Sequence, residues 1–172
     1  MRLNIVLVEP EIPQNTGNIA RTCAATGASL HLVEPLGFTV SDKHLKRAGL
    51  DYWKDVNVSF HKDFNTLRSK YREFPFFYVS TKAQRIYTEI LFPDNCFFVF
   101  GRETKGLPES LLLLNYESCI RIPMRSEIRS LNLANSVAII SYEFFRQKNF
   151  AGLQDHGYIS KPFEAEKQSD PC

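Results

Sequence analysis

The stretch from Cys96 to Ser136 holds the two segments that indicate the fold most clearly, CFFVFGRETKGLPE at Cys96–Glu109 and CIRIPMRSEIRSLNLANS at Cys119–Ser136. Both segments begin with an apolar run of strand length, and both runs lead directly into a loop of Gly, Pro, Ser or Asn. Ligands of open α/β sheets bind beyond the carboxyl ends of the strands. The stretch therefore predicts two loops at one rim of a sheet, placed to enclose one small molecule.

The first loop does not match the common nucleotide-binding motifs. Gly101 and Gly106 have the glycine spacing of a Walker A loop, but Leu107 and Pro108 stand where that motif needs Lys and Ser or Thr. The chain contains no G-x-G-x-x-G segment, so neither a Rossmann dinucleotide site nor the glycine-rich turn of ordinary α/β methyltransferases is indicated. The loops therefore predict a different kind of cofactor site.

The rest of the chain alternates between strand and helix patterns. The apolar run Leu3–Val8 is typical of a central parallel strand that is covered on both faces. We expect a long loop of turn formers at Glu9–Asn18 and a helix from Ile19 to Thr26 that ends at Gly27. Further strands are predicted at Ser29–Val33, Val56–Phe60 and Phe76–Ser80, a weak strand or turn near Ile86–Ile90, and helices at Ser41–Ala48, Asp63–Arg72 and Leu133–Lys148. The predicted fold class is α/β, with a mostly parallel sheet flanked by helices.

Length and composition indicate one domain. The chain has 172 residues, of which 44% are hydrophobic, and this is enough to bury a hydrophobic core without stabilising disulfides or metals. We expect a domain over residues 1–152 and a poorly ordered tail over residues 153–172, because the sequence after Gly152 is polar and has no period. The chain shows no charged-then-apolar leader, and no apolar run approaches about 18 residues. A cytoplasmic protein with no membrane partner is expected.

Cysteine spacing gives no sign of a disulfide framework or a metal site. The chain has four cysteines, and three of them lie in apolar segments: Cys23, Cys96, Cys119 and the terminal Cys172. They show neither C-x-x-C nor metal-ligand spacing. We therefore expect reduced thiols and no bound metal.

Charge and apolar pattern point to two kinds of partner. The net charge of +2 is too small to indicate a nucleic-acid partner, but basic residues cluster locally. We predict RNA contacts, with solvated surface charge as the alternative, at Lys43, Lys46, Arg47, Arg125 and Arg129. The predicted last helix has almost no polar face, which indicates either a deeply buried helix or a subunit interface. We expect the interface, and with it a homodimer.

Three segments together resemble the three sequence motifs of the SPOUT superfamily of RNA methyltransferases. They are EPEIPQNTGNIARTCAATG at Glu9–Gly27, FGRETKGLP at Phe100–Pro108, and IRIPM with RSLNLANSVA within Ile120–Ala138. More narrowly, EPLGF at Glu34–Phe38 and RAGLDY at Arg47–Tyr52 are similar to the TrmL-type tRNA wobble-position 2'-O-methyltransferases. The resemblance runs from about Asn4 to Phe150.

The resemblance implies a SPOUT fold, in which the C-terminal part of the parallel α/β sheet is threaded into a trefoil knot. It also implies S-adenosyl-L-methionine as the cofactor and tRNA as the partner. The implied reaction is methylation of the ribose 2'-hydroxyl of the wobble nucleotide, cytidine or modified uridine 34, with tRNA-Leu isoacceptors as the expected substrates. Two alternatives stay open: another RNA such as ribosomal RNA, and a non-catalytic RNA-binding protein of the same fold.

The resemblance further implies which residues contact the cofactor, mainly through main-chain groups. They are Val79, Gly101, Glu103, Gly106, Ile122, Met124, Ser130, Leu131 and Asn132. The glycines have an alternative interpretation as turn residues, although a missing Cβ also lets an adenine approach the backbone. Ser130 and Asn132 have an alternative role as caps of the last helix. Arg102 departs from the proline that is common at this position in the wobble enzymes.

Arg21 and Asn15 are the predicted catalytic residues. Arg21 matches the functional arginine of the family, and the alternative is a surface arginine on a helix. A guanidinium group does not release its proton in proteins, so Arg21 is a poor general base. We expect it to bind a phosphate beside the target ribose, orient the 2'-hydroxyl and stabilise developing negative charge. RNA phosphate or water then assists the loss of the proton.

Overall fold

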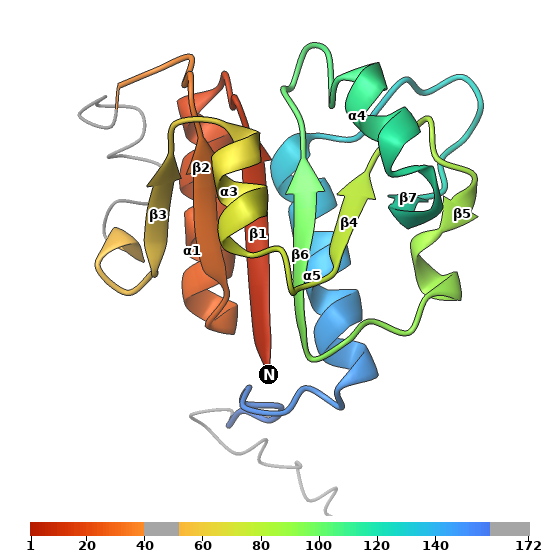
Figure 1. Ribbon diagram of the computed structural model, residues 1–172. Helices are drawn as coiled ribbons and strands as arrows, with labels where there is room; N and C mark the ends of the chain where they lie inside the picture. Colours follow the sequence, from red (N-terminus) through yellow and green to blue (C-terminus); the bar gives the residue numbers. More distant parts are fainter. Residues whose placement is uncertain (40–51, 159–172) are drawn as a thin grey trace, which may run out of the picture.

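The computed structural model describes residues 1–39 and 52–158, and a seven-stranded sheet lies at its centre (Figure 1). The strand order is β3-β2-β1-β6-β4-β7-β5, and all neighbouring strands are parallel. The strands are β1 (Arg2–Val8), β2 (Ser29–Val33), β3 (Val58–His61), β4 (Phe76–Val79), β5 (Arg85–Ile86), β6 (Asn95–Phe100) and β7 (Cys119–Arg121). The predicted α/β class with a mostly parallel sheet is confirmed.

Helices cover both faces of this sheet (Figure 1). They are α1 (Pro13–Thr26), α3 (Phe64–Lys70), α4 (Glu109–Leu114) and α5 (Leu133–Gln147), with two 3-10 turns at Tyr87–Glu89 and Tyr116–Ser118. On one face, Ile19 of α1 and Val137 of α5 belong to the same buried cluster as Leu7. On the other face, Leu67 of α3 and Leu112 of α4 belong to a second cluster.

The central strands read as continuous apolar runs because both of their faces are buried. Ile5, Leu7 and Phe98 are fully buried, and burying each such side chain stabilises the fold by about 1.5–3 kcal/mol. The Phe98 ring also makes edge contacts with the rings of Phe92 and Phe144, at centroid distances of 4.8 and 6.3 Å. The sheet is therefore a well-packed support for the loops at its ends.

The first helix begins earlier than the sequence predicts. The expected loop at Glu9–Asn18 is wrong in its second half, because α1 starts at Pro13 rather than at Ile19. Proline suits the first helical position, where its fixed φ fits the helix and an N–H would lack an intrahelical partner. No side chain at the N-cap position closes this end of α1. The acceptor instead comes from a distant loop, as described below, so no local pattern reveals it.

Other helix ends follow their local signals. Gly27 ends α1 in the left-handed conformation, with φ of 70°, which a glycine adopts without strain. Asp63, at which the predicted helix begins, is the N-cap of α3, because its side chain accepts a hydrogen bond from the N–H of Thr66 at 2.7 Å. The predicted helix at Ser41–Ala48 lies outside the described residues, as does most of the expected tail.

Three of the four cysteines lie in the described part of the chain, and all three are free and buried, as predicted. They are Cys23, Cys96 and Cys119. Burial raises the pKa of Cys23 and of Cys96 to about 12, because a thiolate loses its hydration in the apolar core. These thiols are core residues rather than reactive groups.

The strand order brings distant loops to one rim. β6 lies between β1 and β4, and β7 lies between β4 and β5, so the chain returns twice to positions inside the sheet. The carboxyl ends of these parallel strands meet at the edge that is uppermost in Figure 1. The loops that follow β1, β4, β6 and β7 therefore gather there. The trefoil knot stays a prediction that rests on the family.

Candidate functional site

A cavity of about 480 Å³ opens at this rim, within the size range of small-molecule sites. Its walls come from the loops that follow β4, β6 and β7 and from the start of α1. All nine residues that the sequence predicts as cofactor contacts lie on these walls: Val79, Gly101, Glu103, Gly106, Ile122, Met124, Ser130, Leu131 and Asn132. The two loops predicted within Cys96–Ser136 thus border one site.

Glu103 ties the loop after β6 to the start of α1. Its Oε2 accepts a hydrogen bond from the N–H of Glu11 at 2.8 Å. Its Oε1 accepts from the N–H of Ile12 at 3.3 Å and from Nδ2 of Asn15 at 3.0 Å. Because α1 has no acidic residue in its own first turn, Glu103 also supplies the negative charge that the helix dipole favours at this end. Glu103 is the distant acceptor that lets α1 begin at Pro13.

Asn15 and Asn132 extend this connection to α5. Nδ2 of Asn132 donates to Oδ1 of Asn15 at 3.0 Å. Oδ1 of Asn132 accepts from the N–H groups of Ala134 and Asn135 at 2.9 and 3.3 Å, so Asn132 is the N-cap of α5. The amide of Asn15 is thus bonded at both ends, and the residue is only 6% exposed. The structure gives Asn15 a positioning role, and its predicted catalytic role stays a prediction.

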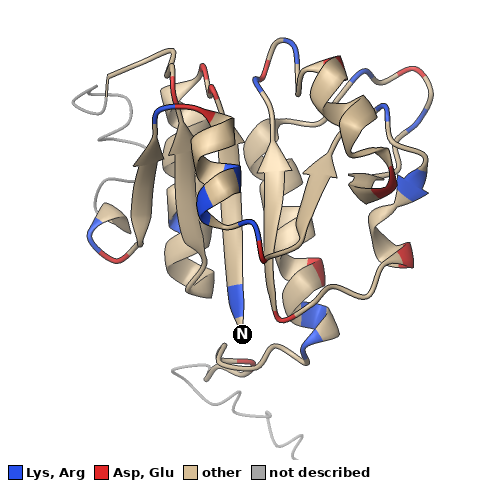
Figure 2. Cartoon of the chain, viewed as in Figure 1, with Lys and Arg blue, Asp and Glu red and all other residues tan. Residues whose placement is uncertain are grey.

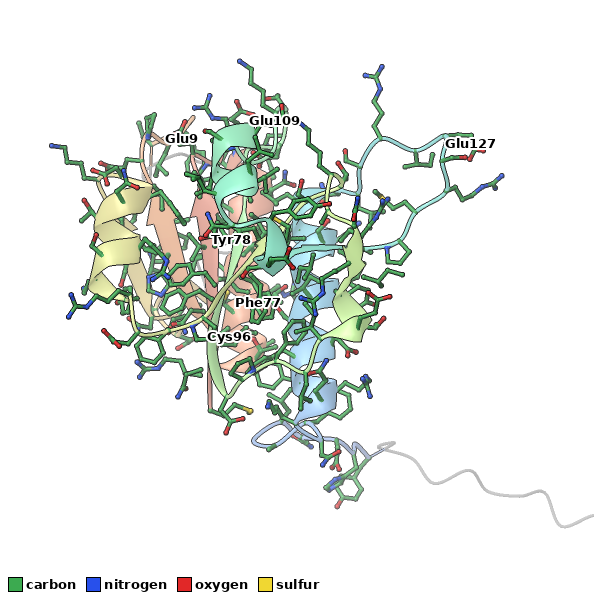
Figure 3. All side chains as sticks on the ribbon, turned by 45° about the vertical axis from the view of Figure 1, so that its right-hand side comes forward. Glu9, Phe77, Tyr78, Cys96, Glu109 and Glu127 are labelled. Atoms are coloured by element: carbon green, nitrogen blue, oxygen red, sulfur yellow. The ribbon has the colours of Figure 1, made fainter. Side chains whose placement is uncertain are left out.

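Two further contacts hold the loop after β6 against the loop after β1. Arg102 lies on the cavity wall, and its guanidinium forms an ion pair with Glu9, which Figure 3 labels at the upper edge of the sheet. Glu9 itself has φ of 52°, a left-handed conformation that is uncommon for a residue with a side chain. Glu11 accepts hydrogen bonds from the N–H and Oγ1 of Thr104, at 3.1 and 2.7 Å. Acidic side chains from both loops therefore bind across the seam between them.

The structure changes the reason for a glycine at position 101. A Cβ built on Gly101 would lie 2.1 Å from the carbonyl carbon of Gly106 and 2.2 Å from the nitrogen of Leu107. Gly101 is therefore required where the loop closes on itself, which is the turn role that the sequence left open as an alternative. Gly106 has φ of 67°, and a Cβ there would meet no atom within 4 Å, so its requirement is conformational.

The cavity wall carries more positive than negative charge. Its charged residues are Lys82, Arg102, Lys105, Arg129 and the single acid Glu103. Figure 2 shows basic segments on the loops above the carboxyl ends of the strands. Lys82 pairs with Glu109 at 3.2 Å, but both side chains are mostly exposed and such a pair holds weakly. An entrance of this charge suits an anionic substrate.

The predicted RNA contacts divide among three locations. Arg129 lies on the cavity wall. Arg125 does not line the cavity; it lies 3.6 Å from Glu127, on the loop that Figure 3 shows projecting from the body of the protein. The third group, Lys43, Lys46 and Arg47, lies outside the described residues.

Arg21 does not lie on the cavity wall of its own chain. It is exposed on α1, six positions after Asn15, and its guanidinium carbon lies 5.0 Å from the centroid of the Tyr52 ring. Six residues advance a helix by about 9 Å and turn it well away from the starting face. The cavity of one chain therefore holds the predicted cofactor contacts without the predicted catalytic arginine.

Part of the cavity wall was not predicted from the sequence. Ser80, Thr81 and Lys82 follow β4 directly and line the cavity, as do Lys105 and Leu107 after β6. The rule that ligands bind beyond the carboxyl ends of parallel strands, applied to β4 as well, identifies the first three.

Residues 1–39 and 52–158 form neither a metal centre nor a membrane-spanning helix. Within these ranges, no group of three or more His, Cys, Asp or Glu side chains is placed to hold a metal ion. The helices of the same ranges include none that is both long and apolar enough to cross a membrane.

The parallel sheet with a three-loop cavity at its carboxyl rim agrees with the family that the sequence matches. Residues 2–142 match the SpoU rRNA Methylase family, so the chain belongs to that family.

Individual relatives are similar over nearly their whole length. A protein of Bacillus subtilis (strain 168), provisionally named tRNA (cytidine(34)-2'-O)-methyltransferase, is 51% identical over 155 residues, which are 88% of this chain and 97% of that protein. The tRNA (cytidine(34)-2'-O)-methyltransferase of Escherichia coli (strain K12) is 46% identical over 151 residues, covering 87% and 96%. A solved structure described as giving insights into the 2-OH methylation of C/U34 on tRNA is 43% identical, covers 87% of this chain and 97% of its own, and has a TM-score of 0.82.

Proposed function

We propose that this protein transfers a methyl group from S-adenosyl-L-methionine to the ribose 2'-hydroxyl of nucleotide 34 of tRNA, a cytidine or modified uridine. The observation that carries the proposal is the cavity of about 480 Å³ at the carboxyl rim, because it gathers all nine predicted cofactor contacts from three separate loops. The names of the relatives in Bacillus subtilis and Escherichia coli support the choice of tRNA and of position 34. Among tRNAs, we propose the tRNA-Leu isoacceptors as substrates, and we place the reaction in the cytoplasm.

The residues on the cavity wall fit such a cofactor. Val79, Leu107 and Ile122 supply apolar surface for an adenine ring, and Ser130 supplies a polar group. The open space beside the Cα of Gly106 leaves the main chain accessible, which suits a base held by backbone N–H and C=O groups. Bound there, S-adenosyl-L-methionine supplies a methyl group that its sulfonium has already activated.

The protein then has to place the ribose and assist its deprotonation. Lys105 and Arg129 at the cavity mouth attract the RNA backbone, because their charges oppose those of the phosphates. Arg21 binds a phosphate next to the target ribose and orients the 2'-hydroxyl for in-line attack, which its planar fork of donors suits. It also stabilises the negative charge that develops on the oxygen as the proton leaves to RNA phosphate or water.

The position of Arg21 supports a homodimer in which two chains complete each site. Arg21 is exposed on α1 and outside the cavity of its own chain. α1 contacts α5, and α5 leaves a stripe of residues uncovered or half-covered at Asn135, Ala138, Ile139, Tyr142 and Arg146. Tyr142 in this stripe is 48% exposed. Pairing two such surfaces buries apolar area and gives Arg21 a route to the cavity of the second chain.

Substitution of Arg21 tests the proposed reaction. Arg21→Ala should lower single-turnover methyl transfer at saturating tRNA by about a hundredfold or more, the scale of losing one preorganised electrostatic contact, while cofactor affinity stays near that of the wild type. Arg21→Lys should recover little of the rate, because it keeps the charge and loses the fork. Mapping the methylated ribose in the product identifies the nucleotide.

Three results would count against the proposal. Wild-type-like turnover of Arg21→Ala removes the role of Arg21. Strong rescue by Arg21→Lys, with high sensitivity to salt, indicates a general RNA contact instead. A light-scattering mass of one subunit at micromolar concentration rejects the dimer.

A further inference from the structure

A second hollow, of about 740 Å³, lies at the same rim above β2 and β3, beside the segment Glu34–Phe38. Its described wall consists of Glu34, Pro35, Leu36, Phe38, Thr39, Phe60 and Lys62. None of these residues lines the cofactor cavity. The reaction as derived above leaves this hollow without a role.

The hollow is fixed to the cofactor cavity through contacts among three loops. The N–H of Gly37 donates to the carbonyl of Pro10 at 2.9 Å, and a Cβ on Gly37 would lie only 2.8 Å from the Cα of Glu11. Glu11 in turn binds Thr104 of the cavity wall through its carboxylate. Three loops in direct contact therefore hold the hollow and the cavity at a set distance.

That distance matches a short stretch of single-stranded RNA. Along the order β3-β2-β1-β6-β4-β7, the strands below the hollow are two to five positions from the strands that border the cavity, which corresponds to roughly 10–24 Å at about 4.8 Å per strand. Stacked nucleotides advance by about 3.4 Å each. An RNA strand whose target ribose lies at the cavity therefore reaches the hollow with a nucleotide a few positions away.

The side chains of the hollow suit a nucleobase. Phe60 is 47% exposed near the end of the edge strand β3, and Phe38 is half-buried on the other segment of the wall. An exposed aromatic ring stacks with any base, and the ammonium of Lys62, also exposed, provides charge for a phosphate. Glu34 adds a carboxylate that accepts hydrogen bonds from a base amino group and repels phosphate. The combination favours a splayed-out base with its phosphate turned toward Lys62.

We propose that Phe60, Phe38 and Lys62 form a stacking site for a nucleobase that flanks the methylated nucleotide in the same RNA. The inference rests on the proposed function for the identity of the RNA as a substrate strand. The site binds substrate outside the reacting centre and selects RNAs whose flanking base is unpaired and free to leave its stack.

The test is a set of three variants in single-turnover methylation of tRNA, with the RNA concentration varied. Phe60→Leu should raise the half-saturating RNA concentration by about 5- to 20-fold, because stacking on an aromatic ring contributes about 1–3 kcal/mol per base and leucine keeps part of the contact. The rate at saturating RNA and the affinity for S-adenosylhomocysteine should stay unchanged. Phe60→Tyr keeps the ring and should restore RNA affinity. Phe74→Leu is the matched control, since Phe74 is 40% exposed in the loop before β4, away from this rim.

A second measurement ties the effect to one base. Anticodon stem-loops that carry a single abasic nucleotide, placed in turn on each side of the target, are compared with wild-type protein and Phe60→Leu. At one position, loss of the base should weaken RNA binding by the wild type and cause no further loss in Phe60→Leu, as expected when the base and Phe60 are the two partners of one contact.

Each other outcome overturns the inference. The stacking site is rejected if Phe60→Leu and the wild type have equal half-saturating RNA concentrations. It is also rejected if Phe60→Leu and Phe74→Leu lose RNA affinity equally. A change of oligomeric state in Phe60→Leu, measured as the light-scattering mass of the assembly, assigns the hollow to a second copy of the chain. Wild-type protein that methylates no tRNA instead rejects the proposed function, so the two failures are distinguishable.

Discussion

Replacing Gly101 with alanine probes how the cofactor loop closes. The added methyl group would lie 2.1 Å from the carbonyl carbon of Gly106 and 2.4 Å from its oxygen, and ordinary contacts begin at 3.4 Å. The peptide between positions 106 and 107 must therefore retreat by about 1.3 Å. Leu107 resists this movement because it is only 5% exposed and belongs to the apolar cluster under α3 and α4. The loop that borders the cavity must shift instead.

A displacement of this size at a binding site has a large effect. A misplacement of about 1 Å costs on the order of a hundredfold in rate, and overpacking a well-packed region costs about 1–3 kcal/mol of stability. We expect Gly101→Ala to bind S-adenosylhomocysteine at least about 30-fold more weakly in isothermal titration calorimetry. Its free energy of unfolding, from urea titration, should fall by about 1–3 kcal/mol.

Gly152→Ala is the control for backbone strain alone. Gly152 has φ of 85°, and a Cβ there would meet no atom within 4 Å, at a turn beyond the end of α5 and outside the cavity wall. This variant should lose about 1 kcal/mol of stability and keep its cofactor affinity. If folded Gly101→Ala binds S-adenosylhomocysteine within about threefold of the wild type, the loop tolerates a side chain at the point where it touches itself, and the proposed closure is wrong.

Two further predictions address the loop network and the core. Glu103→Gln replaces one acceptor oxygen with a donor that faces the donors of Glu11, Ile12 and Asn15, so we expect the rate of single-turnover methylation to fall about 10-fold or more. Glu73→Gln is the control, because Glu73 forms an exposed ion pair with Arg72. An equal loss of rate in both variants would contradict the role of Glu103. His31 is buried, and its pKa is lowered to about 4 by burial and by the charges of His61, Lys70 and Arg2. The folded-state pKa of His31 lies below the unfolded value of 6.5, so neutral His31 adds roughly 3 kcal/mol to the free energy of unfolding. This contribution is complete above pH 6.5 and is lost as the pH falls toward 4. In urea titrations across this range, the free energy of unfolding of His31→Leu should vary less with pH than that of the wild type. An unchanged slope would contradict the lowered pKa of His31.

Local patterns predicted the elements that depend on neighbouring residues. Apolar runs located the central strands, Gly27 located the end of α1, and Asp63 located the start of α3, because each of these signals acts within a few residues. The resemblance located the cavity wall for the same reason, since its motifs are the loops themselves. What these patterns specify is where an element or a loop lies along the chain.

The contacts between loops were not predictable, because their partners are far apart in the sequence. Glu103 accepts hydrogen bonds from residues 88 to 92 positions away, and Asn132 binds Asn15 across 117 positions. The start of α1 at Pro13 was missed because its acceptor is one of these distant groups. The sequence could not choose between a turn role and an adenine contact for Gly101, because the close approach of Gly106 depends on how the whole loop closes.

The arrangement of the sheet explains why these contacts exist at all. Parallel strands must be joined by crossovers, and the loops that follow β1, β3, β6 and β7 at the carboxyl rim each lead into a helix. β1 and β6 are neighbours in register from Arg2↔Asn95 to Leu7↔Phe100, although more than 90 residues separate them. Their loops therefore begin side by side, and the acids Glu9, Glu11 and Glu103 bind across the resulting seam. Any change that slides β6 along β1 by one residue would break all three contacts together, which makes the register of this strand pair a requirement for the cofactor cavity.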